Sequence, residues 1–219
     1  MARKTTFTRE DVVAAALRVI DQEGLGAMSA RRVAEAMKAS TAPVYSNFAS
    51  MEELFGDVMR RASEMIIATC RRPWTEDVFL DMGVGFVHFA HDHPQLFRAL
   101  YLDSSWGRRN EDLIFAARLD DLAAHPVLGQ LPPDHREELL FQASVYTLGL
   151  ATSLVTEVWP DPDLDLAESW LRSVGGLLAR AALESAGLPM PPEMARSLGE
   201  FVVPWRQPRC PGRKEGSHD

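Results

Sequence analysis

Cysteine is nearly absent from this chain of 219 residues, which holds only Cys70 and Cys210. The two lie far apart in the sequence, so they do not suggest the disulfide framework that stabilises small secreted domains. Their scarcity fits a reducing cytoplasm, and we expect a buried or idle thiol at each position. The alternative is a redox-sensing role for Cys70, for which only Arg71 and Arg72 would supply a basic neighbourhood.

Targeting and membrane-spanning segments are also lacking. The N-terminal residues 1–11 are charged and contain no apolar core, so we expect no signal peptide. The longest uncharged run, Leu139–Thr156, is borderline in length for a membrane span, but Ser, Thr and Gln side chains interrupt it. A buried helix of a soluble protein explains this run better. We therefore expect a cytoplasmic protein without a membrane partner.

Catalytic, cofactor and metal motifs are missing as well. No nucleophile motif, phosphate-binding loop or paired-carboxylate pattern is visible, so we expect neither an enzyme nor a bound cofactor. His88, His91 and His93 with Asp92 could form a metal cluster, because His88 and His91 share one helix face. We favour a metal-free helix end before Pro94, since no second ligand pair at metal spacing follows.

An excess of positive charge is absent from the whole chain, whose formal net charge is −8. The charge is unevenly distributed, however. Residues 1–72 carry 11 Lys and Arg against 9 Asp and Glu, whereas the remainder carries 12 against 22. The basic part is therefore N-terminal and only modestly positive. If it binds DNA, its affinity should depend on geometry and dimerisation as well as on charge.

What the sequence does contain is a helix-turn-helix pattern at residues 29–48. Ser29 is predicted to cap a first short helix, and Lys38 lies in the turn that follows. Ser40 is predicted to cap the second helix, with Pro43 in its first turn. The outward side chains of the second helix are small or polar, which allows close approach to base edges in a major groove. They are Thr41, Ala42, Tyr45, Ser46 and Asn47.

Around this pattern the chain resembles the DNA-binding domain of TetR-family regulators. The resemblance runs from Thr8 to about Ala68 and rests on four ordered segments: residues 12–24, 31–37, 40–48 and 50–54. It implies an all-α chain with an N-terminal helix-turn-helix DNA-binding domain at residues 7–68. A C-terminal helical ligand-binding and dimerisation domain at 74–187 and a partly disordered tail at 188–219 would follow.

The resemblance also implies which residues contact DNA. One group faces the bases: Arg31, Thr41, Ala42 and Pro43. A second group faces phosphates or the groove wall: Ser29, Tyr45, Ser46, Asn47 and Ser50. The remaining candidates add positive charge or begin the reading helix: Lys4, Arg32, Lys38 and Ser40. The segment that holds Lys4 is either a frayed terminus or an arm that reaches phosphate or the minor groove.

Three positions depart from the family pattern. Lys38 stands where a turn glycine is common, and a positive φ there would cost a lysine about 1 kcal/mol. Asn47 replaces a frequent histidine, and Met51 replaces a frequent lysine that meets phosphate. These departures concern individual contacts rather than the fold.

The second part of the chain is predicted to be helical from its periodicity. We expect helices at about 75–91, 94–101, 110–124, 134–157 and 164–185, and a short one near Met194. Thr75 is expected to cap the first of these, with Val78 facing inward. By resemblance, some side chains of the middle helices line a pocket for an apolar or aromatic small molecule. The candidates are Phe86, His88, Phe97, Tyr101, Trp106, Phe115, Phe141, Gln142 and Tyr146.

The last two long helices are apolar on more faces than one chain can cover. The family implies that they pair with those of a second chain, through Leu150, Leu154, Trp170, Leu171, Val174 and Leu178. An ordinary monomeric helix pair is the alternative. We favour the dimer because one short recognition helix binds weakly, whereas symmetric dimers read two half-sites.

The predicted function follows from these parts. The resemblance implies a homodimeric transcriptional repressor that a small-molecule effector releases from a palindromic, double-stranded DNA operator. The alternative is a TetR-like scaffold that acts as a protein-binding or sensor module with weak affinity for DNA.

Overall fold

The computed structural model describes residues 7–102, 107–156, 158 and 163–198. The expectations for Lys4, Trp106, Cys210 and the tail beyond residue 198 lie outside these residues. Within the described ranges the regular elements are helices and no strand occurs, which confirms the all-α prediction. In chain order they are α1 (Arg9–Glu23), η1 (Leu25–Ala27), α2 (Ala30–Ala36), α3 (Ala42–Asn47), α4 (Met51–Cys70), α5 (Val78–Asp92), α6 (Pro94–Phe97), η2 (Arg98–Leu102), α7 (Gly107–Ala123), η3 (Leu128–Gln130), α8 (Pro133–Val155), α9 (Leu164–Ser185) and α10 (Pro192–Ser197).

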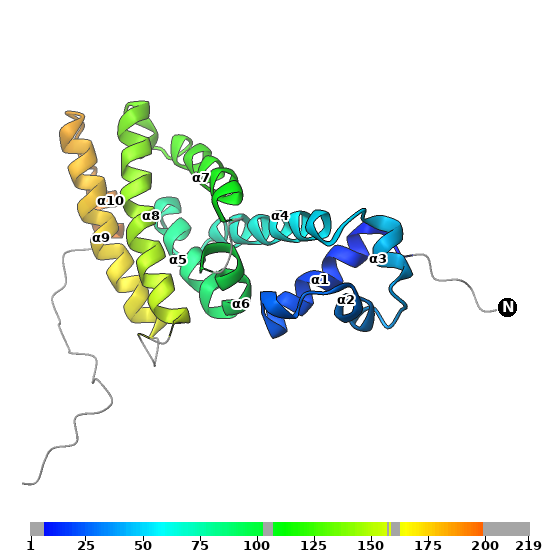
Figure 1. The fold of residues 1–219 in the computed structure, drawn as a ribbon. Coiled ribbons are helices and arrows are strands. Elements are labelled where there is room, and N and C mark those ends of the chain that lie inside the picture. The colour runs from blue at the N-terminus through cyan, green and yellow to red at the C-terminus, as the bar shows by residue number, and fades with distance from the viewer. Residues whose placement is uncertain (1–6, 103–106, 157, 159–162, 199–219) are drawn as a thin grey trace, which may run out of the picture.

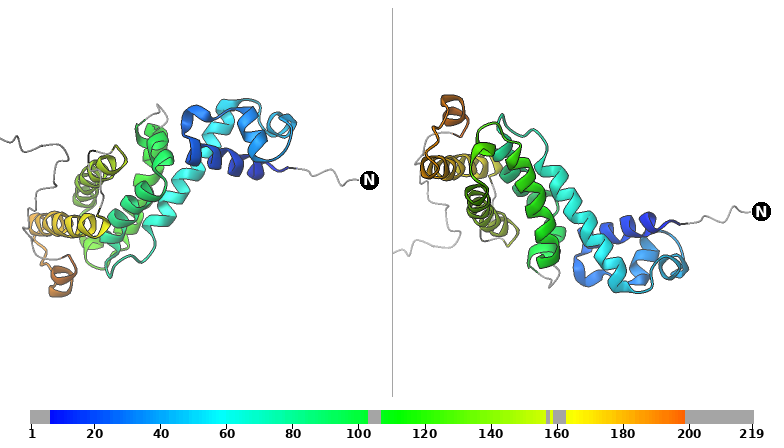
Figure 2. Two further views of the ribbon diagram at one scale, coloured as in Figure 1. Left: turned by 90° about the horizontal axis from the view of Figure 1, so that it is seen from below. Right: turned by 90° about the horizontal axis from the view of Figure 1, so that it is seen from above.

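The helices form two groups joined by α4 (Figure 1). Helices α1 to α3 make a head at one end of the molecule, and α8 and α9 lie side by side at the other end (Figure 2). Helix α4 packs against α1 at its start and against α5 and α7 further along. Its 20 residues span about 30 Å as one continuous helix. Helix α4 therefore connects the head directly to the second group of helices.

The starts of α1, α2 and α4 follow the capping chemistry predicted from the sequence. The Thr8 hydroxyl accepts from the Asp11 amide at 3.2 Å, and Asp11 accepts from the Thr8 amide at 2.8 Å. These hydrogen bonds lower the pKa of Asp11. The Ser29 hydroxyl caps α2 by accepting from the Arg32 amide at 3.3 Å. Ser50 caps α4 by accepting from the Glu53 amide at 3.1 Å. Three predicted caps are thus confirmed.

Two other predicted caps are wrong. Helix α3 begins at Ala42, with Thr41 in the cap position and no side-chain capping bond, so Ser40 lies one residue too early. Helix α5 is capped by Asp77, whose Oδ1 accepts from the amides of Phe79 and Leu80 in the first turn, at 2.9 and 3.2 Å. The Thr75 hydroxyl instead donates to Asp81 Oδ1 at 2.8 Å. The helix consequently starts three residues later than expected.

That later start also corrects the expected inward face of α5, because Val78 is the first helical residue and is 50% exposed. The remaining core positions of α5 are buried as predicted, among them Phe79, Met82, Phe86 and Phe89. The break at His93 and Pro94 is confirmed, since α5 ends at Asp92 and α6 begins at Pro94.

Helices α4 and α5 touch at backbone level where they cross. A Cβ atom added at Gly85 would lie 2.6 Å from both the Cys70 Cα and the Thr69 carbonyl oxygen. Only glycine permits this approach without moving one helix, because backbone atoms cannot rotate away. At this crossing the last turn of α4 is packed against the middle of α5. Helix α5 also lines the interior of the second group.

The histidines singled out in the sequence have separate surroundings. His93 Nδ1 lies 3.0 Å from Asp21 Oδ2 and joins the second group to α1. His91 pairs with Asp92 at 2.9 Å, and His88 stacks on Trp74 with ring centroids 4.0 Å apart. Among the described residues no group of three or more metal-binding side chains is found.

Helix α8 has the length and apolar composition of a membrane-crossing helix, with a mean hydropathy of 1.2 over its most apolar window. It also packs against α5, α7 and α9 within the bundle. Composition and length do not distinguish a core helix from a membrane span, so the packing is the more informative property.

Candidate nucleic-acid interface and interior cavities

Helix α3 presents its small and polar side chains outward. Val44 and Phe48, which are 1% and 3% exposed, anchor the helix to the core of the head. The outward set is exposed, as the sequence predicted: Ser40, Thr41, Ala42, Tyr45 and Ser46. Tyr45 is the most prominent side chain there at 63% exposure. This face is narrow enough to enter a major groove and offers hydroxyl groups to bases or phosphates.

The C-terminal end of α3 is held by Arg9, a residue that the sequence reasoning missed. Arg9 Nη1 donates to the Asn47 carbonyl oxygen at 2.9 Å, and its guanidinium lies 4.0 Å from the centroid of the Phe48 ring. The same group pairs with Asp57 and Glu53, both at 2.8 Å, which raises the pKa of Arg9. These contacts join α1, α3 and the start of α4. They span up to 48 residues of sequence, so no local pattern signals them.

Asn47 differs from its expected role at the groove wall. Its Nδ2 donates to the Pro43 carbonyl at 2.8 Å and to the Phe7 carbonyl at 3.3 Å. The side chain is therefore occupied within the chain and ties the segment before α1 to α3. Asn47 positions the reading helix, and the exposed residues of that helix remain the candidates for direct contact with DNA.

The predicted basic residues of α2 are paired with carboxylates. Arg31 is 87% exposed and pairs with Glu35 at 3.0 Å. Arg32 bonds to Glu23 and Glu35, and these hydrogen bonds raise its pKa, while Arg32 and Arg31 together lower the pKa of Glu35. An exposed ion pair contributes at most about 1 kcal/mol, so Arg31 can exchange Glu35 for a phosphate or a base at little cost.

The turn between α2 and α3 has the strained backbone that the sequence suggested. Lys38 has φ +53°, and it is the only non-glycine residue with positive φ in the described part of the chain. The turn is closed by the Ala39 amide, which donates to the Ala34 carbonyl at 2.9 Å. The left-handed conformation is therefore built into the motif, although a lysine occupies it.

We expect Lys38→Gly to raise the free energy of unfolding by about 0.5–1 kcal/mol, the relief of left-handed strain less the added entropy of the unfolded chain. Lys38→Ala is the matched control, because it removes the same charge and keeps the strain. Urea unfolding followed by circular dichroism measures both variants. Equal stability of the glycine and alanine variants would contradict the strain at this turn.

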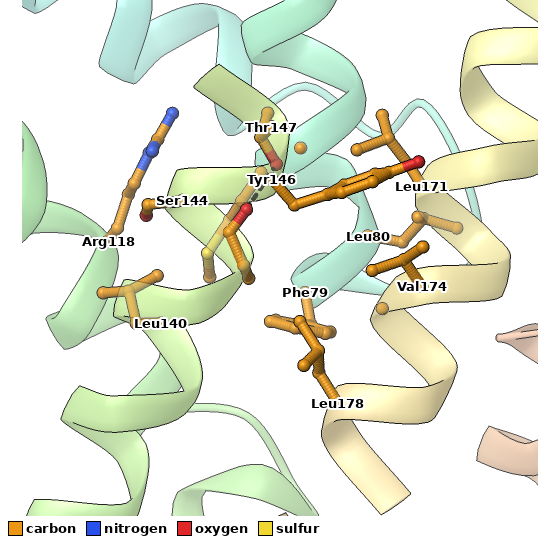
Figure 3. A pocket seen from close by; sticks show the side chains of 14 residues that line it. Phe79, Leu80, Arg118, Leu140, Ser144, Tyr146, Thr147, Leu171, Val174 and Leu178 are labelled. Atoms are coloured by element: carbon orange, nitrogen blue, oxygen red, sulfur yellow. Dashed lines mark hydrogen bonds between the residues drawn. The ribbon is translucent and has the colours of Figure 1, made fainter. Parts of the chain in front are cut away.

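The second group of helices contains two cavities, and both are partly open to solvent. The first lies between α5, α8 and α9 and includes Phe79, Leu140, Tyr146 and Leu171 (Figure 3). The second lies between α5, α7 and α8, with four of the predicted aromatic residues in its lining: Phe86, Tyr101, Phe115 and Phe141. Burial raises the pKa of the Tyr146 phenol, which keeps that group neutral.

Three other predicted lining residues lie elsewhere. Phe97 is fully buried behind Phe86 in an edge-to-face contact, with centroids 5.6 Å apart. His88 lines neither cavity; its half-buried ring stacks on Trp74, and burial lowers its pKa. Gln142 faces an outer groove between α8 and α9, where Nε2 donates to Glu138 at 2.6 Å. None of these three side chains reaches either cavity.

Arg118 and Ser144 line both cavities, and the sequence reasoning missed them. Arg118 is 8% exposed, and neither its Nε nor Ser144 Oγ has a hydrogen-bond partner. The sequence spacing could have indicated that Arg118 is buried. Ile114, Arg118 and Leu122 follow one another at four-residue spacing and form one buried stripe of α7. Cys70 is buried beside Arg118, as expected for a structural thiol.

The outer face of α8 and α9 carries exposed apolar side chains. Phe141 and Val145 of α8, which also border the open second cavity, are each 58% exposed, and Leu177 of α9 is 47% exposed. A Cβ atom at Gly149 of α8 would meet no atom within 4 Å. The face is thus open in a single chain, and exposed apolar residues on neighbouring helices are typical of association surfaces.

The exposed apolar residues of α8 and α9 differ from those predicted for the dimer interface. Leu150, Leu154 and Leu171 are only 8%, 8% and 5% exposed, because their helical phase turns them into the bundle. Val174 and Leu178 line the first cavity, and Trp170 is half-buried. The correction moves the candidate association surface by part of a helical turn.

Comparison with known proteins finds a family match for the head and solved structures with a similar fold for the chain. Residues 12–58 match the family model described as bacterial regulatory proteins, tetR family. A TetR-family transcriptional regulator from Streptomyces coelicolor superposes with a TM-score of 0.63 at 17% identity, over 87% of this chain and 86% of that one. A protein of unknown function from Rhodococcus sp. RHA1 gives 0.64 at 16% identity, over 83% and 98%.

The structure of the multidrug binding protein EbrR complexed with imidazole gives a TM-score of 0.54 at 20% identity, over 84% of this chain and 96% of that one. No curated protein sequence matches the chain. The family match covers the helix-turn-helix and the helices that frame it, and the solved structures share the fold of the remainder. Residues 12–58 therefore match the tetR family of bacterial regulatory proteins, and the chain as a whole shares the fold of the TetR-family structures.

Proposed function

We propose that the protein is a homodimeric transcriptional repressor that leaves its operator when a small molecule occupies the interior cavities. The observation that carries this proposal is the exposed face of α3, where small and hydroxyl-bearing side chains project from a helix fixed at its C-terminal end by Arg9. Such a surface suits close approach to base edges, because its side chains are small or carry hydroxyl groups.

Dimerisation would supply the affinity that a single short helix lacks. Two heads bind adjacent major grooves when their recognition helices lie about 34 Å apart, one turn of DNA. The open apolar face of α8 and α9 lies at the far end of the molecule from α3 (Figures 1 and 2). Pairing through that face leaves both heads free and sets their separation. A palindromic operator follows from the two-fold symmetry.

Release by a ligand would act through α4. The cavities are bordered by α5, and α5 touches the backbone of α4 at Gly85. The His93–Asp21 contact adds a second connection, from the start of α6 to α1. A ligand that favours a different position of α5 changes the separation of the heads and shifts the population away from the DNA-bound state. This sequence of contacts supports release of DNA by a ligand.

A gel-shift experiment with the DNA upstream of the protein's own gene tests the proposal. We expect a specific complex at low salt, and Arg31→Ala should weaken it by about 10-fold, the effect of losing one direct contact to a base. If no specific band forms and Arg31→Ala equals the wild type, the repressor proposal fails. The scaffold would then serve as a sensor or protein-binding module.

A further inference from the structure

The interior of the second group of helices contains a cation without an ionic partner. The Arg118 guanidinium lies 4.6 Å from the Phe86 ring centroid, and Nη2 donates to Cys70 Sγ at 3.6 Å. Its Nε has no partner, although the side chain is more than nine-tenths buried. An aromatic face and a thiol compensate a buried charge less well than a carboxylate does. The cavity wall therefore carries an unbalanced positive charge.

No acidic residue of the described chain lines either cavity. Two acidic residues of α5 and α7 have partners of their own. Asp81 accepts from the Thr75 hydroxyl at 2.8 Å, and Asp121 pairs with Arg71 at 2.9 Å on the surface. The described residues thus supply no anion opposite Arg118, so a molecule that enters the cavity could supply it.

Ser144 adds a hydrogen-bonding group at the same place. It comes from α8, lines both cavities with Arg118, and its buried hydroxyl has no partner. Figure 3 shows Arg118 and Ser144 on one side of the first cavity, with apolar side chains such as Leu171, Val174 and Leu178 opposite. A guanidinium and a hydroxyl within an apolar lining form an amphipathic site, with a charged and polar group on one side and apolar side chains on the other.

We propose that the effector is an amphipathic carboxylic acid whose carboxylate binds Arg118 and Ser144 and whose apolar body fills the cavities. This inference rests on the proposed function, in which the interior is the effector site. The planar guanidinium matches the two oxygens of a carboxylate, and a neutral or cationic molecule of equal shape leaves the arginine uncompensated. The acid would also draw Arg118 away from Cys70, the last residue of α4, which couples binding to the helix that carries the head.

Isothermal titration calorimetry of the full chain without DNA tests the assignment, with 4-phenylbutyrate and decanoate as probes and their primary amides as neutral controls. We expect each acid to bind at least about 10-fold more tightly than its amide, since only the acid pairs with the buried cation. Arg118→Met should erase that preference by weakening the acid and sparing the amide. Ser144→Ala should weaken the acid by less.

Equal affinities of acids and amides, or an acid affinity unchanged by Arg118→Met, would overturn the proposal, as would acids that fail to bind at about 1 mM. Arg118→Met should unfold at the same temperature as the wild type or higher, because it removes an unpaired buried charge. If that variant does not fold, Arg118→Lys replaces it. Lysine keeps the charge but cannot form the bidentate pair with a carboxylate. An acid affinity of Arg118→Lys equal to that of the wild type would then contradict the proposal. If the acids bind but the complex with operator DNA stays intact, the proposed release of DNA by the ligand is refuted. The preference of the cavity for acids over amides is not affected by that result.

Discussion

The Ala42→Glu substitution should weaken operator binding by at least about 30-fold, because each of two heads in a dimer loses roughly 1–3 kcal/mol. Ala42 is the first residue of α3 and is exposed on the face that would meet the bases. A carboxylate there faces phosphates and the acceptor-rich edges of purines, so it is repelled and loses its hydration. Fluorescence anisotropy with labelled operator DNA measures the change.

Ala68→Glu provides the matched control. Ala68 is exposed on the last part of α4, away from the head, and the substitution makes the same change of charge. It should leave DNA affinity nearly unaltered, and both variants should keep the wild-type helical content. Operator binding by Ala42→Glu that equals binding by Ala68→Glu would mean that α3 does not read DNA.

The Leu177→Arg substitution should convert the proposed dimer to single chains of 24.4 kDa. Leu177 is 47% exposed on the outer face of α9 and lines neither interior cavity, so the fold of one chain does not need it. In the proposed interface an arginine would bury a charge without a partner, which costs several kcal/mol on each side of the symmetry axis. Analytical ultracentrifugation gives the mass directly.

Leu113→Arg is the control for this experiment, because Leu113 is a comparably exposed leucine, at 44%, on α7 rather than on the α8–α9 face. It should sediment as the wild type does. The Leu177→Arg protein should also lose operator affinity, since a monomer has only one reading head. A Leu177→Arg protein that remains dimeric would place the association surface elsewhere.

Local patterns in the sequence predicted much of the fold. Helix α9 begins and ends at the expected residues, and the caps at Thr8, Ser29 and Ser50 form as their side chains suggested. Each of these features depends on neighbours within a few residues, which a single sequence displays. The exposed residues of α3 were predictable for the same reason, since the family motif fixes their helical phase.

Contacts between distant segments were less predictable. The Arg9 contacts join three helices, and the partners of Asn47 include a carbonyl 40 residues away. The outer face of α8 was misplaced because an apolar helix offers several plausible inward stripes, and only packing selects one. Arg118 was overlooked because a charged residue in a helix is usually solvated. Its burial depends on α5 and α8 closing over it.

Selection of binding sequences from random duplex DNA by the purified full chain tests the central claim most directly. Two α3 helices held by a symmetric dimer should enrich a palindrome whose half-sites are about 10 base pairs apart, and two chains should bind each selected duplex. The Ala42→Glu protein should enrich nothing. An unenriched pool, or a single half-site bound by one chain, would contradict the account of a dimeric DNA-reading repressor.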